Sequence, residues 1–113
     1  MPYITTTTNT KITDDKREII KSEYGKAISL LGKTEGWLML NFEDEKDMFF
    51  KGESDKPMAF VDVSVFGKSS DEQCNEMTKE ICRILGTNLG IAPDKIYVKF
   101  SGYSQWGWNN MTF

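Results

Sequence analysis

The chain has 113 residues, which is the length of one ordinary domain, and 39% of them are hydrophobic. Its 14 basic and 17 acidic side chains give a net charge of −3, and without a basic excess we expect no nucleic-acid partner. The chain contains no histidine, which excludes histidine-based triads and removes the commonest ligand of transition metals. Its apolar runs are far too short to span a bilayer, so we expect no membrane association.

The first half of the chain has the pattern strand, helix, strand. Residues 3–8 are β-branched or aromatic and predict a strand. Thr13 is suited to cap a helix that Gly32 would end. The apolar positions with helical spacing between them are Ile20, Tyr24, Ala27, Ile28 and Leu31. Residues 37–42 predict a second strand, buried on both faces for most of its length, and residues 43–47 predict a solvated acidic loop.

The second half repeats this pattern. Pro57 precedes a strand predicted over residues 58–66, in which valines alternate, and Ser70 with Gln73 fits a capping box. The apolar face of the following helix comprises Cys74, Met77, Ile81, Ile84 and Leu85. We interpret the two thiols, Cys74 and Cys82, as inert core filling. Gly90 ends this helix, and alternation over residues 96–100 predicts a fourth strand.

Together these elements predict a two-layer α+β sandwich in a single domain, residues 1–113. The pseudo-repeats, about 1–56 and 57–113, are each a β-α-β unit, and the two units form a four-stranded mixed sheet with two helices on one face. A ferredoxin-like arrangement alternates in the same way and stays open. The sheet face without helices would carry four bulky side chains, which predicts oligomerisation. These side chains are Met39, Phe60, Phe66 and Tyr97.

Pro2 could act as a base if Met1 is removed. The chain would then begin with a secondary amine, and an α-amino group titrates at about 7.7–8.0, closer to neutrality than any other base in this sequence. Burial or a nearby cation would disfavour its protonated form and raise the uncharged fraction. The alternative is that a proline simply follows the initiator methionine.

Two segments resemble the end of a phosphate-binding loop, Gly-Lys-Thr at 32–34 and Gly-Lys-Ser at 67–69. Both lack the earlier glycine that such a loop requires, so neither predicts phosphate binding.

Four segments of the chain occur in an order that carries a resemblance. They are Met-Pro at the start, Gly-Lys at 32–33, Pro-Asp-Lys-Ile-Tyr-Val at 93–98 and Trp-Gly-Trp-Asn-Asn-Met-Thr-Phe at 106–113. Together they resemble the macrophage migration inhibitory factor family of the tautomerase superfamily over essentially the whole chain. The resemblance implies a homotrimer with active sites at the subunit interfaces. It also implies keto–enol tautomerisation of small aromatic 2-keto acids, of the phenylpyruvate or dopachrome type, without a metal or an organic cofactor.

The resemblance also implies roles for individual residues. Pro2 would be the catalytic base, Lys33 would hold the carboxylate or carbonyl oxygen of the substrate, and Tyr97 would come from the neighbouring subunit. The residues implied to bind substrate are Lys33, Trp37, Phe66, Tyr97, Lys99, Trp108 and Phe113.

Three of these positions depart from the family pattern. Trp37 stands where a tyrosine is usual, Phe66 where an isoleucine is usual and Lys99 where an asparagine is usual. A second cation at Lys99 would favour an uncharged Pro2 and attract carboxylates. The Cys-x-x-Cys motif of vertebrate relatives is absent, because Met58 and Val61 occupy its positions. No thiol-redox activity is therefore implied.

Two other functions stay open. The chain could be a cytokine-like signalling protein that binds a cell-surface receptor, with vestigial tautomerase activity, or a ferredoxin-like binding module without catalysis. Because the N-terminus resembles no secretory leader, we expect a cytoplasmic protein. Secretion would require a leaderless route.

Overall fold

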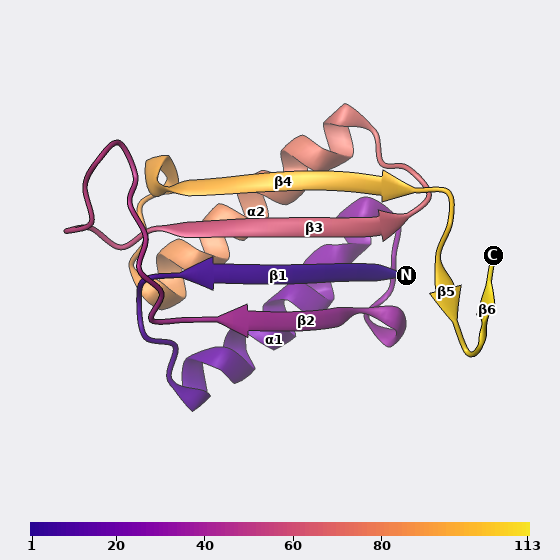
Figure 1. The fold of residues 1–113 in the computed structure, drawn as a ribbon, viewed down its shortest axis with the longest axis horizontal. Helices are drawn as coiled ribbons and strands as arrows, with labels where there is room; N and C mark the ends of the chain where they lie inside the picture. Colours follow the sequence, from indigo (N-terminus) through magenta and orange to yellow (C-terminus); the bar gives the residue numbers. More distant parts are fainter.

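A computed structural model describes residues 1–113 and consists of a four-stranded sheet with two helices behind it (Figure 1). The main elements are β1 (Pro2–Thr8), α1 (Asp14–Ala27), β2 (Met39–Glu43), β3 (Ala59–Phe66), α2 (Asp71–Leu89) and β4 (Ile96–Tyr103). Short 3₁₀ turns are η1 (Ile28–Leu31), η2 (Glu35–Trp37) and η3 (Pro93–Lys95). A small hairpin of β5 (Gly107–Trp108) and β6 (Met111–Thr112) follows. Neither helix is long and apolar enough to cross a membrane.

The strand order, β2-β1-β3-β4, confirms the duplicated β-α-β unit. β1 pairs in parallel with β2, β3 pairs in parallel with β4, and the two units meet where β1 and β3 run antiparallel. In a ferredoxin-like fold another strand lies between the two strands of each unit. Here Tyr3 of β1 lies directly opposite Met39 of β2, and Ala59 of β3 lies opposite Ile96 of β4, so that alternative is excluded.

The helix ends follow the predicted capping residues. The side chain of Thr13 accepts a hydrogen bond from the amide of Lys16, and Ser70 with Gln73 forms a complete capping box. Gly32 and Gly90 each adopt the left-handed conformation, with φ of 71° and 66°, that a glycine allows without strain. The first helical segment is not uniform, however, because α1 ends at Ala27 and the last turn before Gly32 is the 3₁₀ turn η1.

The core lies between the sheet and the two helices. Alternate residues of β1 and β3 point into it, and all five predicted apolar positions of the first helical segment are buried. The core also contains one polar pair, in which the hydroxyl groups of Thr6 and Tyr24 lie 2.8 Å apart and are both fully buried. This pairing satisfies two groups that would otherwise destabilise an apolar interior.

Two predictions about the region around β2 are wrong. The strand begins at Met39 rather than at residue 37, and it is not buried on both faces, since the side chain of Met39 is 66% exposed. The reason is topological: β2 is an edge strand, and only its inward side chains, Leu40 and Phe42, pack against the core. The acidic loop that follows is exposed at residues 45–47, as predicted, while Asp44 accepts a hydrogen bond of 2.8 Å from the amide of Ile12.

The sheet face away from the helices, which we call the open face, carries the bulky side chains expected there. Met39 and Tyr97 are 66% and 60% exposed, while Phe60 and Phe66 are half-buried. Between these apolar groups, one polar row crosses all four strands. Register places its members side by side in the order Asn41, Thr5, Asp62, Lys99.

Candidate active site

Pro2 begins β1 in the middle of the sheet, where it lies opposite Val65 of β3 and is buried. A proline is tolerated at the first position of a strand because no ladder hydrogen bond from its nitrogen is required there. A cavity of about 670 Å³ opens beside Pro2. Burial, followed by the charge of Lys33, lowers the pKa of the amino group of Met1 below its ordinary value of 8.0. The N-terminal end of β1 therefore favours an uncharged amine.

Lys33 follows the helix cap at Gly32 and reaches the end of β3. Its Nζ donates a hydrogen bond of 2.9 Å to the backbone carbonyl of Phe66, and the amide of Phe66 donates one of 3.1 Å to the carbonyl of Met1. The predicted cation and the N-terminus are thus connected through the backbone of one residue. The charge of Lys33 acts on the terminal amine through space, since both groups lie at the end of β3.

Two aromatic pairs lie at the same end of the sheet. The rings of Trp37 and Trp108 meet edge to face, with their centroids 5.0 Å apart, and both side chains line the cavity beside Pro2. The rings of Phe66 and Phe113 lie 5.5 Å apart. The N-terminus lies at the end of the sheet where β1 begins, and the β5–β6 hairpin and the C-terminus lie beyond that end (Figure 1). The fold therefore gathers Pro2, Lys33 and these four aromatic residues from segments far apart in sequence.

The cavity also has lining residues that the sequence analysis did not identify as site residues. They are Met1, Tyr3, Gly36, Leu38, Met39, Ser64, Tyr103, Gln105, Trp106 and Gly107. Tyr3 and Ser64 face each other across β1 and β3 on the open face, and Met39 lies beside them on β2. The alternation within each strand places these residues on one face. Only the order of the strands brings them beside Pro2.

Tyr97 and Lys99 do not reach this cavity within one chain. Tyr97 lies opposite Phe60, which lies opposite Thr7, so it is at the other end of β1 from Pro2. The ring of Tyr97 instead meets that of Phe50 at 5.2 Å. Lys99 forms an ion pair with Asp62, with 3.1 Å between Nζ and Oδ2, so the cation expected from the sequence is paired with an acid of its own chain.

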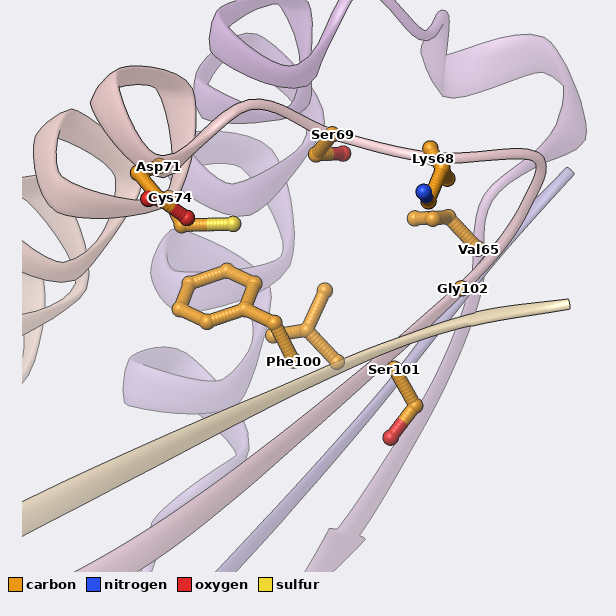
Figure 2. Close-up of a pocket in the computed structure, with 9 residues that line it drawn as sticks. Val65, Lys68, Ser69, Asp71, Cys74, Phe100, Ser101 and Gly102 are labelled. Carbon is orange, nitrogen blue, oxygen red and sulfur yellow. The ribbon is translucent and has the colours of Figure 1, made fainter.

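A second hollow lies between the start of α2 and the ends of β3 and β4 (Figure 2), and one of its lining residues, Val65, is the strand partner of Pro2. Its volume is about 430 Å³, and none of its lining residues belongs to the predicted site. Cys74 lines this hollow and is half-buried, as is Cys82. The sequence predicts both thiols in the core, whereas in the structure each is only partly buried. Burial raises the pKa of both thiols and keeps them protonated, so neither is activated as a nucleophile.

This end of the sheet brings together the groups that proton transfer at carbon requires, although Lys33, Phe66 and Phe113 are not among the residues that line the cavity beside Pro2. An uncharged amine accepts a proton, and a fixed cation stabilises negative charge that develops on an oxygen. Aromatic walls bind a planar ring and exclude water. No three acidic or cysteine side chains anywhere in the chain come together as a metal site.

Comparison with known proteins agrees with this arrangement. The family model described as "Macrophage migration inhibitory factor (MIF)" matches residues 1–113. The macrophage migration inhibitory factor of Meriones unguiculatus is 26% identical, over 100% of this chain and 99% of that protein. The crystal structure of Leishmania major MIF2 is 31% identical, covers 100% of this chain and 97% of the other, and superimposes with a TM-score of 0.92. The homologue from Prochlorococcus marinus is 28% identical, covers 98% of each chain and has a TM-score of 0.87. The chain therefore belongs to the macrophage migration inhibitory factor family, with the fold of the tautomerase superfamily.

Proposed function

We propose that this protein is a keto–enol tautomerase in which Pro2, exposed by removal of Met1, is the catalytic base. Its substrates would be small aromatic 2-keto acids such as phenylpyruvate. The observation that supports this most is the position of Pro2, buried beside an aromatic cavity, with Lys33 near enough to the chain terminus for its charge to lower the pKa of the terminal amine. Family membership supports the class of reaction.

In the proposed reaction one proton moves between carbon and oxygen. The uncharged nitrogen of Pro2 removes a proton from the carbon between the ring and the carbonyl, and the electron pair of that C–H bond forms the enolate. The charge of Lys33 stabilises the negative oxygen as it develops. The protonated amine then returns the proton to that oxygen, which gives the enol and restores the base. No oxidant or further reactant is consumed.

We further propose that the active protein is a homotrimer in which a neighbouring protomer supplies Tyr97 and Lys99. The open face supports an assembly, since its exposed Met39 and Tyr97 would otherwise remain in water. Both outer strands also support it, because β2 and β4 each present an unpaired edge. Sedimentation equilibrium tests this assembly, and a monomer at the concentrations used for activity would contradict it.

The activity is tested by adding the purified protein to the enol form of phenylpyruvate and following the loss of its absorbance. Mass spectrometry of the same sample must show that Met1 has been removed. Pro2→Gly is expected to lower kcat/KM by about a hundredfold or more, because a positioned general base contributes about 10²–10⁴. A chain that retains Met1 is the matched control and is expected to be inactive. Equal turnover by the processed and unprocessed chains would exclude Pro2 as the base.

A second candidate, a signalling protein, is supported by the names of the relatives, which describe inhibition of macrophage migration. In this proposal the surface of the assembly binds a cell-surface receptor. Binding to receptor-bearing cells that persists in Pro2→Gly would support a signalling role independent of catalysis. Binding that is lost with Pro2 would favour the enzyme alone.

A further inference from the structure

The ion pair between Lys99 and Asp62 lies on the open face, at the centre of the polar row. The two residues are directly opposite each other on β4 and β3, and 3.1 Å separates Nζ from Oδ2. Their side chains are 57% and 36% exposed, so in a single chain the pair is in contact with water. Such a pair adds little stability by itself. We therefore consider the net charge that the two side chains together present to a bound ligand.

The polar row that holds this pair contains no other charged residue. The other members of its row, Thr5 and Asn41, are neutral, and the nearest ring is that of Phe60, whose centroid lies 5.8 Å from Nζ. The acid in the adjacent row, Glu43, is bonded to Asn41 at 3.3 Å. Asp62 is thus the acid that sets the net charge presented at Lys99.

We propose that Asp62 is a specificity-determining residue, which neutralises Lys99 so that the site selects substrates with an uncharged ring end. This inference rests on the proposed function, in which Lys99 of one protomer faces the cavity at Pro2 of its neighbour. Lys33 would hold the carboxylate of the keto acid, so Lys99 would meet the opposite end of the substrate. A lysine alone would attract an anionic group there. Lysine paired with aspartate presents a dipole with no net charge, which suits a plain or hydroxyl-bearing ring.

The electrostatic argument depends on where the pair resides after assembly. In water at 0.15 M salt, charges more than about 8 Å apart are largely screened from one another. Packing of a protomer against the open face would remove much of this water and strengthen the interaction of both charges with a ligand. The carboxylate of Asp62 would then repel an anionic ring substituent at close range, and it would also compete with that substituent for Nζ.

The test compares two substrates that differ only in charge at the ring end, phenylpyruvate and 4-carboxyphenylpyruvate. The measured quantity is the ratio of kcat/KM for the carboxylated substrate to that for phenylpyruvate. Asp62→Asn keeps the shape of the side chain and frees Lys99, so the ratio is expected to rise about fivefold or more. Lys99→Gln leaves Asp62 unpaired, so the ratio is expected to fall by a similar factor. The double variant is expected to return close to the wild-type ratio.

A change in folding would alter kcat/KM for both substrates, whereas the ratio responds to charge at the ring end. Glu18→Gln is the matched control, since it removes one carboxylate from the exposed pair with Lys21 on α1 and is expected to leave the ratio unchanged. An unchanged ratio in Asp62→Asn, in an active protein, would overturn this inference and leave the proposed function standing. Absence of turnover of phenylpyruvate by the processed wild-type protein would overturn both.

Discussion

The side chain of Lys33 ends on the backbone carbonyl oxygen of Phe66, 2.9 Å from Nζ, although the two residues belong to different halves of the chain. Phe66 also donates its amide to the carbonyl of Met1, 3.1 Å away. In the chain that retains Met1, the cation and the first residue therefore both contact the end of β3.

Lys33→Ala should lower kcat/KM for phenylpyruvate by about a hundredfold, because the enolate oxygen loses the cation that stabilises it. Lys33→Arg keeps the charge and is expected to retain more activity than the alanine variant. Steady-state kinetics of the three proteins checks this order. Equal activity of the alanine variant and the wild type would show that the cation has no part in the reaction.

The terminal amine of the unprocessed chain should titrate below its ordinary value of 8.0, since burial and then the charge of Lys33 both lower its pKa. Lys33→Ala should raise this pKa, and NMR of a ¹⁵N-labelled Met1 amine measures the change. The sign for stability follows from proton binding. Between the folded pKa and 8.0 the unfolded chain holds more protons, so the free energy of unfolding should rise with pH across this window. A flat dependence in the wild type would contradict it.

Trp37→Ala and Trp108→Ala should each raise KM about tenfold, because each removes one half of an edge-to-face pair that lines the cavity. Both side chains are about half exposed, so the loss of folding stability should be small. Ile19→Ala is the control, since it truncates an exposed apolar side chain on α1 away from the cavity and should leave KM unchanged. An unaffected KM in both tryptophan variants would remove these rings from the binding site.

Gly102→Ala should destabilise the fold by about 1–3 kcal/mol, because a Cβ at this position of β4 would overlap the carbonyl oxygen of Gly67. The amide of Gly67 is held by the carbonyl of Tyr103, so the turn after β3 has little freedom to move aside. Urea denaturation measures the change. Gly36→Ala is the matched control, since its Cβ would lie 3.8 Å from the nearest atom, and it should change stability by less than about 0.5 kcal/mol.

Tyr24→Phe should lower the free energy of unfolding by about 1–3 kcal/mol, because it leaves the buried hydroxyl of Thr6 without its partner. The double variant with Thr6→Val should recover part of this loss, since neither polar group is then buried. Tyr97→Phe, at an exposed ring, is the control. Denaturation of the wild type, Tyr24→Phe, Thr6→Val and the double variant gives the coupling between the two hydroxyl groups, and a coupling near zero would contradict the prediction.

Tyr24 should also affect the folding stability of the protein at alkaline pH. Burial raises the pKa of the Tyr24 phenol far above its usual value of 10.0. The folded protein therefore holds a proton that the unfolded chain releases, and this stabilisation is fully present below pH 10 and is lost as the pH rises further. Tyr24→Phe should show a weaker loss of stability above pH 10 than the wild type, and thermal melts at several alkaline pH values measure it.

Local chemistry made much of the fold predictable from the sequence. The alternation of valines in residues 59–66, the capping box at Ser70 and the glycine at position 90 each act within a few residues, so each is visible in the sequence and was confirmed. Pro2 could likewise be chosen as the candidate base, because an amine that titrates near neutrality is a property of the residue and of its place at a chain end. The contacts that Pro2 makes could not be predicted from the sequence.

The surroundings of the candidate site residues depend on strand order and long-range contacts. The sequence alone determined a pair of β-α-β units, their core faces and a candidate base. The tertiary structure decided that β2 is an edge strand with Met39 exposed, that Lys33 meets the carbonyl of Phe66, and that Asp62 forms an ion pair with Lys99. Each of these depends on which strands lie side by side. Lys33 and Phe66 are 33 positions apart in the sequence, and Asp62 and Lys99 are 37 positions apart. Such residues become neighbours only through the pairing of whole strands, and periodicity within a segment carries no information about that pairing.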